Sequence, residues 1–271
     1  MKFSGIITVA GMCAGLLTVA FSATAFAAVT PAPVAVASAA TVVALNDCGL
    51  TADDVAQIGA IQSDPTLSAT EEITKELAVR KQLIGKTISC AQADVQSLQK
   101  ALAAAPVSGD AAAGIQTQLQ GRLNDAAIFY TLELGKLNDA GISGSESIAR
   151  DILAWRAGTY APLLGQVNNF ILWTGNQNLF STAQTRMNQT QQAVSFFESA
   201  SANTDLQNAF DAAYSSFRTA KSTNANAQAA LAQSLPSDQS LLLIKQSLDA
   251  LSDTYQKFFA VTDIIKTLLP Q

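Results

Sequence analysis

Apolar residues recur at helical spacing along most of the chain from Thr51 onward. The longest series follows Thr70, and its members are separated by three, four or seven residues: Ile73, Leu77, Ile84, Ile88, Ala91, Val95, Leu98 and Leu102. Residues with this spacing share one face of an α-helix. Pro106 and Gly109 end the series. The pattern therefore predicts one long amphipathic helix before position 106.

Capping and turn residues divide the remaining pattern into further helices. Thr51 with Asp54 marks the start of a short first helix. We expect the other helices to begin at Asp110, Ser145, Thr204 and Ser237. Alternation of apolar and polar residues is not convincing anywhere, so strands are not expected. The chain predicts an all-α fold, an elongated up-and-down antiparallel bundle of about six to seven long helices.

The segment 145–202 is the least certain part of this division. Pro162, preceded by Gly158, predicts a kink because proline cannot continue the helical hydrogen bonding. The run Thr174-Gly175-Asn176 can end one helix and begin another. A break there gives two helices close in length to the others, whereas its absence gives one long kinked helix. We expect the break.

The first 46 residues follow a different pattern. Lys2 is the only charge before Asp47, and an apolar run leads to the small-residue sequence Ala25-Phe26-Ala27. This order is that of a secretory signal peptide. We expect a signal peptide at 1–27, a flexible Ala/Pro/Val-rich spacer at 28–46 and a single all-helical domain at 47–271. An uncleaved segment 1–27 would instead be a membrane anchor.

Composition limits the chemistry that the chain can perform. It has no histidine, three cysteines and a net charge of −5. Histidine-dependent triads and HExxH zinc sites are excluded, and no nucleotide-binding glycine motif is present. We therefore expect no enzyme activity, no cofactor and no metal site. An acidic chain without a basic cluster also argues against nucleic acid as a partner.

Cysteine placement predicts one disulfide. Removal of 1–27 takes Cys13 with it and leaves Cys48 and Cys90. Export implies an oxidising compartment, and two cysteines allow only one intramolecular pair. A short first helix lying antiparallel along the long second helix would bring Cys48 beside Cys90. Closing this loop would stabilise the fold by roughly 4 kcal/mol.

Aromatic and amide residues between 148 and 176 form the candidate binding surface. Trp155 and Trp173 are 18 residues apart, which is five turns of an uninterrupted helix. With Tyr160, Asn169 and Asn176 they can form a strip for a protein partner or a sugar. The alternative is that both indole rings pack against an adjacent helix.

One arginine lies near the middle of the same apolar stripe. If Arg156 is buried, its guanidinium needs a carboxylate partner, and Glu133 on the preceding helix is the candidate. If the helix rolls, the Arg156 side chain instead extends to water.

These features favour an exported, non-enzymatic interaction or scaffolding protein of the cell envelope or exterior. Its partner would be a protein or a cell-surface component, and it would meet the membrane only through an uncleaved N-terminal segment. Two alternatives remain open. A carrier of an apolar ligand would need a cavity in the bundle core, and an all-helical pore-former would need a segment that enters the bilayer.

Overall fold

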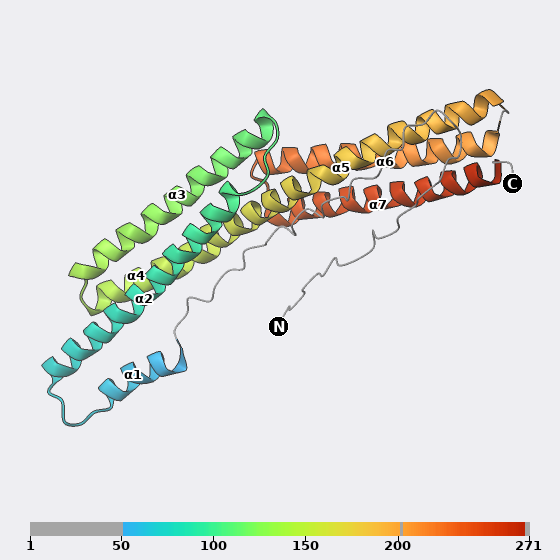
Figure 1. Ribbon diagram of the computed structural model, residues 1–271. Helices are drawn as coiled ribbons and strands as arrows, with labels where there is room; N and C mark the ends of the chain where they lie inside the picture. Colours follow the sequence, from blue (N-terminus) through green and yellow to red (C-terminus); the bar gives the residue numbers. More distant parts are fainter. Residues whose placement is uncertain (1–50, 201–202, 269–271) are drawn as a thin grey trace. The chain divides into compact units, whose positions relative to one another are not determined.

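The computed structural model describes residues 51–200 and 203–268, which belong to one compact unit running from Ala37 to Gln271. The described residues contain helices and turns but no strand, so the all-α prediction is confirmed. The signal peptide 1–27 and the spacer 28–46 lie outside the described residues. The helices are α1 (Ala52–Gln62), α2 (Ala69–Ala103), α3 (Asp110–Asp139), α4 (Ile142–Trp155), a π-helix (Arg156–Tyr160), α5 (Ala161–Ala200), α6 (Thr204–Ala232) and α7 (Ser237–Leu268) (Figure 1).

Side-chain caps set the starts of several helices. Thr51 and Asp54 form the predicted capping box, in which each side chain accepts the other residue's backbone N–H, at 3.2 and 2.8 Å. The predicted caps of α2 and α6 are each displaced by one or two residues. Ser68, rather than Thr70, caps α2, and Asn203, rather than Thr204, caps α6. The predicted cap positions were wrong because, in each helix, a nearby polar residue caps the first turn instead.

The expected helix break at 174–176 is wrong, because α5 runs through these residues without interruption. Thr174 is buried, and its hydroxyl donates to the carbonyl of Ile171 at 3.0 Å, so it bonds within the helix instead of capping a new one. The irregular turn lies earlier, in the π-helix just before Pro162. The segment 142–200 is thus helical throughout, with one π turn.

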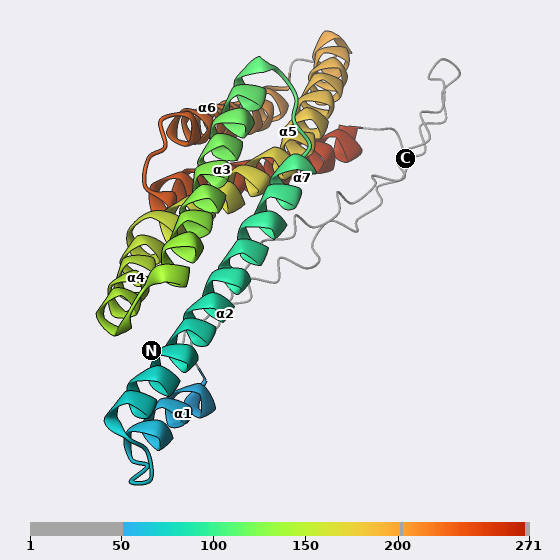
Figure 2. The ribbon, with the colours of Figure 1, turned by 90° about the vertical axis from the view of Figure 1, so that its left-hand side faces the viewer.

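Two apolar clusters hold helices α2 to α7 together, and α5 contributes to both. The first is formed mainly by α2, α3, α4 and the N-terminal half of α5. The second is formed by the C-terminal half of α5 with α6 and α7. Figures 1 and 2 show α3 beside α2, and α6 beside α7. Because α5 packs on α3, α6 and α7, it connects the two clusters.

A seven-residue repeat explains how closely α6 and α7 associate. In α6 the buried residues Leu206, Ala213, Ala220 and Ala227 are seven apart, and in α7 so are Ser240, Ser247, Thr254 and Val261. A second series in α7 consists of Ile244, Leu251, Phe258 and Ile265. This repeat is that of a coiled coil, in which small residues let two helices approach each other closely. Within the described residues, no helix is both long enough and apolar enough to cross a membrane.

Candidate functional site

The π-helix at Arg156–Tyr160 is the main irregularity in the described chain. Its hydrogen bond runs from the N–H of Ala161 to the carbonyl of Arg156, five residues back. Pro162 follows immediately; it has no N–H to donate, and its ring would collide with the carbonyl of Gly158 in a regular helix. A widened turn relieves that collision. Such turns are frequent at functional sites, so its surroundings are the first place to look for one.

Arg156 is partly buried and pairs with a carboxylate on α2. Its Nη2 lies 3.8 Å from Oδ2 of Asp94, and the two side chains are 14% and 3% exposed. Both predictions for this residue were therefore wrong, since Arg156 neither extends to water nor pairs with Glu133. Glu133 instead accepts a hydrogen bond from Lys136, one turn along α3, at 2.6 Å. The second oxygen of Glu133 is buried and makes no hydrogen bond to the described residues.

Four aromatic rings form a cluster next to Arg156. Trp155 stacks on Phe129 at 4.2 Å between ring centroids, and the edge of Tyr130 meets Trp155 at 5.3 Å. The guanidinium of Arg156 lies over the ring of Tyr160, 5.7 Å from its centroid. Aromatic side chains from α3, α4 and the π-helix thus form one cluster that includes the ring in contact with Arg156.

Burial decides the protonation of the two tyrosines. It raises the pKa of Tyr130, and the nearby Arg156 charge opposes this rise. It also raises the pKa of Tyr160, with a further increase from the carboxylate of Asp94. Both hydroxyls therefore stay neutral at physiological pH. The cluster is suited to fixing how α2, α3 and the π-helix pack.

The predicted binding strip is not an exposed surface. Tyr160, Asn169 and Trp173 are 1%, 6% and 4% exposed, and Trp155 is half-buried against Phe129. The amide of Asn169 donates to the carbonyl of Ser237 and to the hydroxyl of Ser240, so it bonds α5 to α7. Asn176, the fifth member, is half-buried.

The π-helix explains why Trp155 and Trp173 do not form one strip. One extra residue in a turn rotates all later side chains by about 100° relative to earlier ones. Trp155 precedes the π turn and Trp173 follows it, so the two indoles do not share a line. The alternative prediction, that both rings pack against neighbouring helices, is the one that the structure favours.

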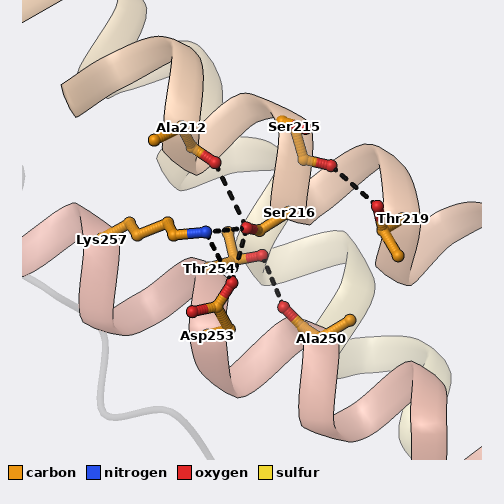
Figure 3. Close-up of polar contacts among 8 residues, drawn as sticks. All are labelled: Ala212, Ser215, Ser216, Thr219, Ala250, Asp253, Thr254 and Lys257. Carbon is orange, nitrogen blue, oxygen red and sulfur yellow. Dashed lines mark hydrogen bonds and ion pairs between the residues drawn. The ribbon is translucent and has the colours of Figure 1, made fainter. Parts of the chain in front are cut away.

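A polar cluster that sequence reasoning missed joins α6 to α7 (Figure 3). Ser216 donates to the carboxylate of Asp253 at 2.6 Å, and Lys257 donates to the same carboxylate at 2.7 Å. Lys257 also donates to the Ser216 hydroxyl. Serine beside lysine resembles a nucleophile with its base, but here the ammonium is paired with a carboxylate and has no lone pair to accept a proton.

These bonds act instead as a link between helices. Lys257, followed by Ser216, lowers the pKa of Asp253 because both donate hydrogen bonds to its charged form. Ser216 is 8% exposed, whereas the side chain of Asp253 is 49% exposed. The cluster therefore sits at the edge of the α6–α7 contact, where it favours one register of the two helices.

The predicted disulfide is only half within the described chain. Cys90 is half-buried in α2, and Cys48 lies outside the described residues. The packing of α1 is compatible with the prediction, since Lys86, one turn before Cys90, forms an ion pair with Asp54 at 3.3 Å. Ile58, further along α1, lies near Leu83, so α1 runs antiparallel to α2. The disulfide stays a prediction.

Comparisons with known proteins add no family to this picture: no family model, no curated protein and no solved structure matches the chain. Within the described ranges, no cluster of cysteine, aspartate or glutamate side chains could hold a metal ion.

Proposed function

We propose that this chain is an exported, non-enzymatic interaction or scaffolding protein of the cell envelope or exterior. Residues 1–27 act as the signal peptide, and residues 28–46 separate the folded part from the surface to which it is delivered. Residues 47–271 form one antiparallel helical bundle. Its partner is a protein or a cell-surface component, in keeping with a weakly charged, acidic surface that does not suit nucleic acid.

The observation that carries the scaffolding proposal is the seven-residue repeat of α6 and α7. Every position of the series Ala213, Ala220 and Ala227 is fully buried, and the facing series in α7 is buried equally. Long helices held along their whole length by such a repeat resist bending and keep binding surfaces at fixed separations. Rigidity of this kind serves a spacer or adaptor.

Exposed apolar side chains supply contact points on this framework. Leu153, Phe196 and Leu132 are 71%, 65% and 59% exposed. They lie on α4, α5 and α3. Large apolar residues on a surface of low charge are suited to binding a protein partner.

The test is cross-linking on intact cells that produce the full chain. A membrane-impermeant, amine-reactive cross-linker reaches only proteins beyond the cytoplasmic membrane. We expect it to join the chain to a reproducible partner. The control is a variant with Leu16→Arg and Leu17→Arg, which interrupts the apolar run and blocks export. Protection of the wild-type chain from the reagent, to the same extent as this variant, would contradict export.

A further inference from the structure

A groove separates α1 from α4, and both of these helices pack on α2, which forms its floor. Figure 2 shows α1 beside the N-terminal half of α2. The groove encloses about 350 Å³, a volume in the range of small-molecule sites. Ile58, Ile84 and Ala149 line it and are half-buried, so part of each apolar side chain remains accessible. Leu83 also lines the groove but is only 3% exposed.

The groove stays open because the residues of α4 that face it are small. Ser145 and Ala149 are four positions apart and share one face of α4. From the opposite side, α1 contributes Ile58 to the lining. The Ser145 hydroxyl is buried and donates to the carbonyl of Ile142 at 2.7 Å, so it is not available to a ligand. A larger side chain at position 149 would fill the space.

One cation at the edge of the groove has no carboxylate partner among the described residues. The lining includes three charged side chains, those of Arg80, Glu146 and Arg150. Arg80 forms ion pairs with Glu146 at 3.1 Å and with Glu76 at 2.5 Å. Arg150 is exposed and forms no ion pair with any residue that the structure describes. Its guanidinium can therefore bind an anionic group beside the apolar walls.

This combination of apolar walls and one cation restricts the class of ligand. Several charges on the ligand would be placed against Ile58 and Ile84, where they would lose water without gaining a partner. Sugar hydroxyls would find few free hydrogen-bonding groups, because Ser145 bonds within its own helix. A molecule with one apolar chain and one anionic end satisfies both parts of the lining.

We propose that this groove binds a free fatty acid of medium chain length. The acyl chain lies against Ile58, Ile84 and Ala149, and burial of its methylene groups supplies most of the affinity. The carboxylate binds the guanidinium of Arg150. This binding activity goes beyond the interaction function proposed above, and it does not depend on export.

The experiment is calorimetric titration of the purified full chain with octanoate, with 1-octanol as the neutral counterpart. We expect octanoate to bind in the millimolar range or more tightly. Decanoate should bind more tightly still, because each further methylene that enters the groove strengthens binding by up to about fourfold. Arg150→Gln should weaken octanoate binding by up to about fivefold and leave octanol binding unchanged. Ala149→Leu places a larger side chain in the groove and should abolish binding of both.

The matched control is Arg218→Gln, which removes the same charge from an exposed position on α6 that does not line the groove. It should leave octanoate binding unchanged. Circular dichroism checks that each variant is folded. Absence of octanoate binding, equal weakening by Arg150→Gln and Arg218→Gln, or wild-type affinity in a folded Ala149→Leu variant would each overturn the proposal.

Discussion

Replacing Asp94 by Asn removes the carboxylate that pairs with Arg156 but keeps the shape of the side chain. The pair is separated by 3.8 Å between Oδ2 and Nη2, with Asp94 only 3% exposed. At an effective dielectric constant of about 20, the attraction at this distance is about 4 kcal/mol. Without the carboxylate, the guanidinium loses this ion pair while most of its side chain stays out of water.

The size of the effect follows from the burial of the two side chains. Breaking a buried ion pair by removing one partner costs about 3–5 kcal/mol. The Arg156 side chain keeps 14% exposure and its contact with the Tyr160 ring, which both reduce the penalty. We therefore expect a loss near the lower end of that range, about 3 kcal/mol in the free energy of unfolding.

Urea unfolding followed by circular dichroism measures this loss, with Asp263→Asn as the matched control. Asp263 and Lys266 are closer, at 2.9 Å, but 71% and 50% exposed. Their pair should contribute less than about 1 kcal/mol. The double variant Asp94→Leu, Arg156→Met removes both charges and should recover most of the stability. Equal, small losses of unfolding free energy for Asp94→Asn and Asp263→Asn would show that the Asp94–Arg156 pair does not stabilise the fold more than an exposed pair.

Three further predictions follow from the packing. Gly165→Ala places a Cβ 2.7 Å from the side chain of Ser237 and should destabilise the fold. Gly121→Ala lies in open space on α3 and should stabilise the fold by up to about 1 kcal/mol. The melting temperatures of the two variants should shift in opposite directions. Trp173→Ala should cost about 3–5 kcal/mol of unfolding free energy in urea, because the ring is buried. Asp253 has a lowered pKa in the folded chain, so the stability that its charge contributes is present above its unfolded pKa of about 3.9 and is lost as the pH falls through the lower folded pKa. The difference in unfolding free energy between wild type and Asp253→Asn should therefore shrink on acidification. A constant difference would contradict the link between α6 and α7.

Local signals in the sequence were enough to predict most helices. The apolar stripe of α3, from Ile115 to Leu137, is buried as expected, and α3 begins at Asp110. These features depend on residues within a few turns of one another. The differences of two residues at Ser68 and one residue at Asn203 arose because nearby polar residues can serve equally well as caps.

Features that depend on contacts between distant segments were not predictable in the same way. The partner of Arg156 is Asp94, 62 positions earlier in the chain, and the choice between it and Glu133 depends on how three helices pack. The phase change at the π-helix moved Trp173 into the core, although Pro162 signalled an irregularity nearby. The seven-residue repeat of α6 and α7 was readable in the sequence.

Mass spectrometry of the intact, unreduced protein recovered from its native cells tests the central claim, export with a single disulfide, most directly. We expect a chain that begins at Ala28 and is found outside the cytoplasm. Its mass should be lower, by two hydrogen atoms, than that of the same chain with free Cys48 and Cys90. Reduction should restore those two hydrogen atoms. A chain that still carries residues 1–27, stays in the cytoplasmic fraction and reacts with alkylating reagent at both cysteines without reduction would contradict the account.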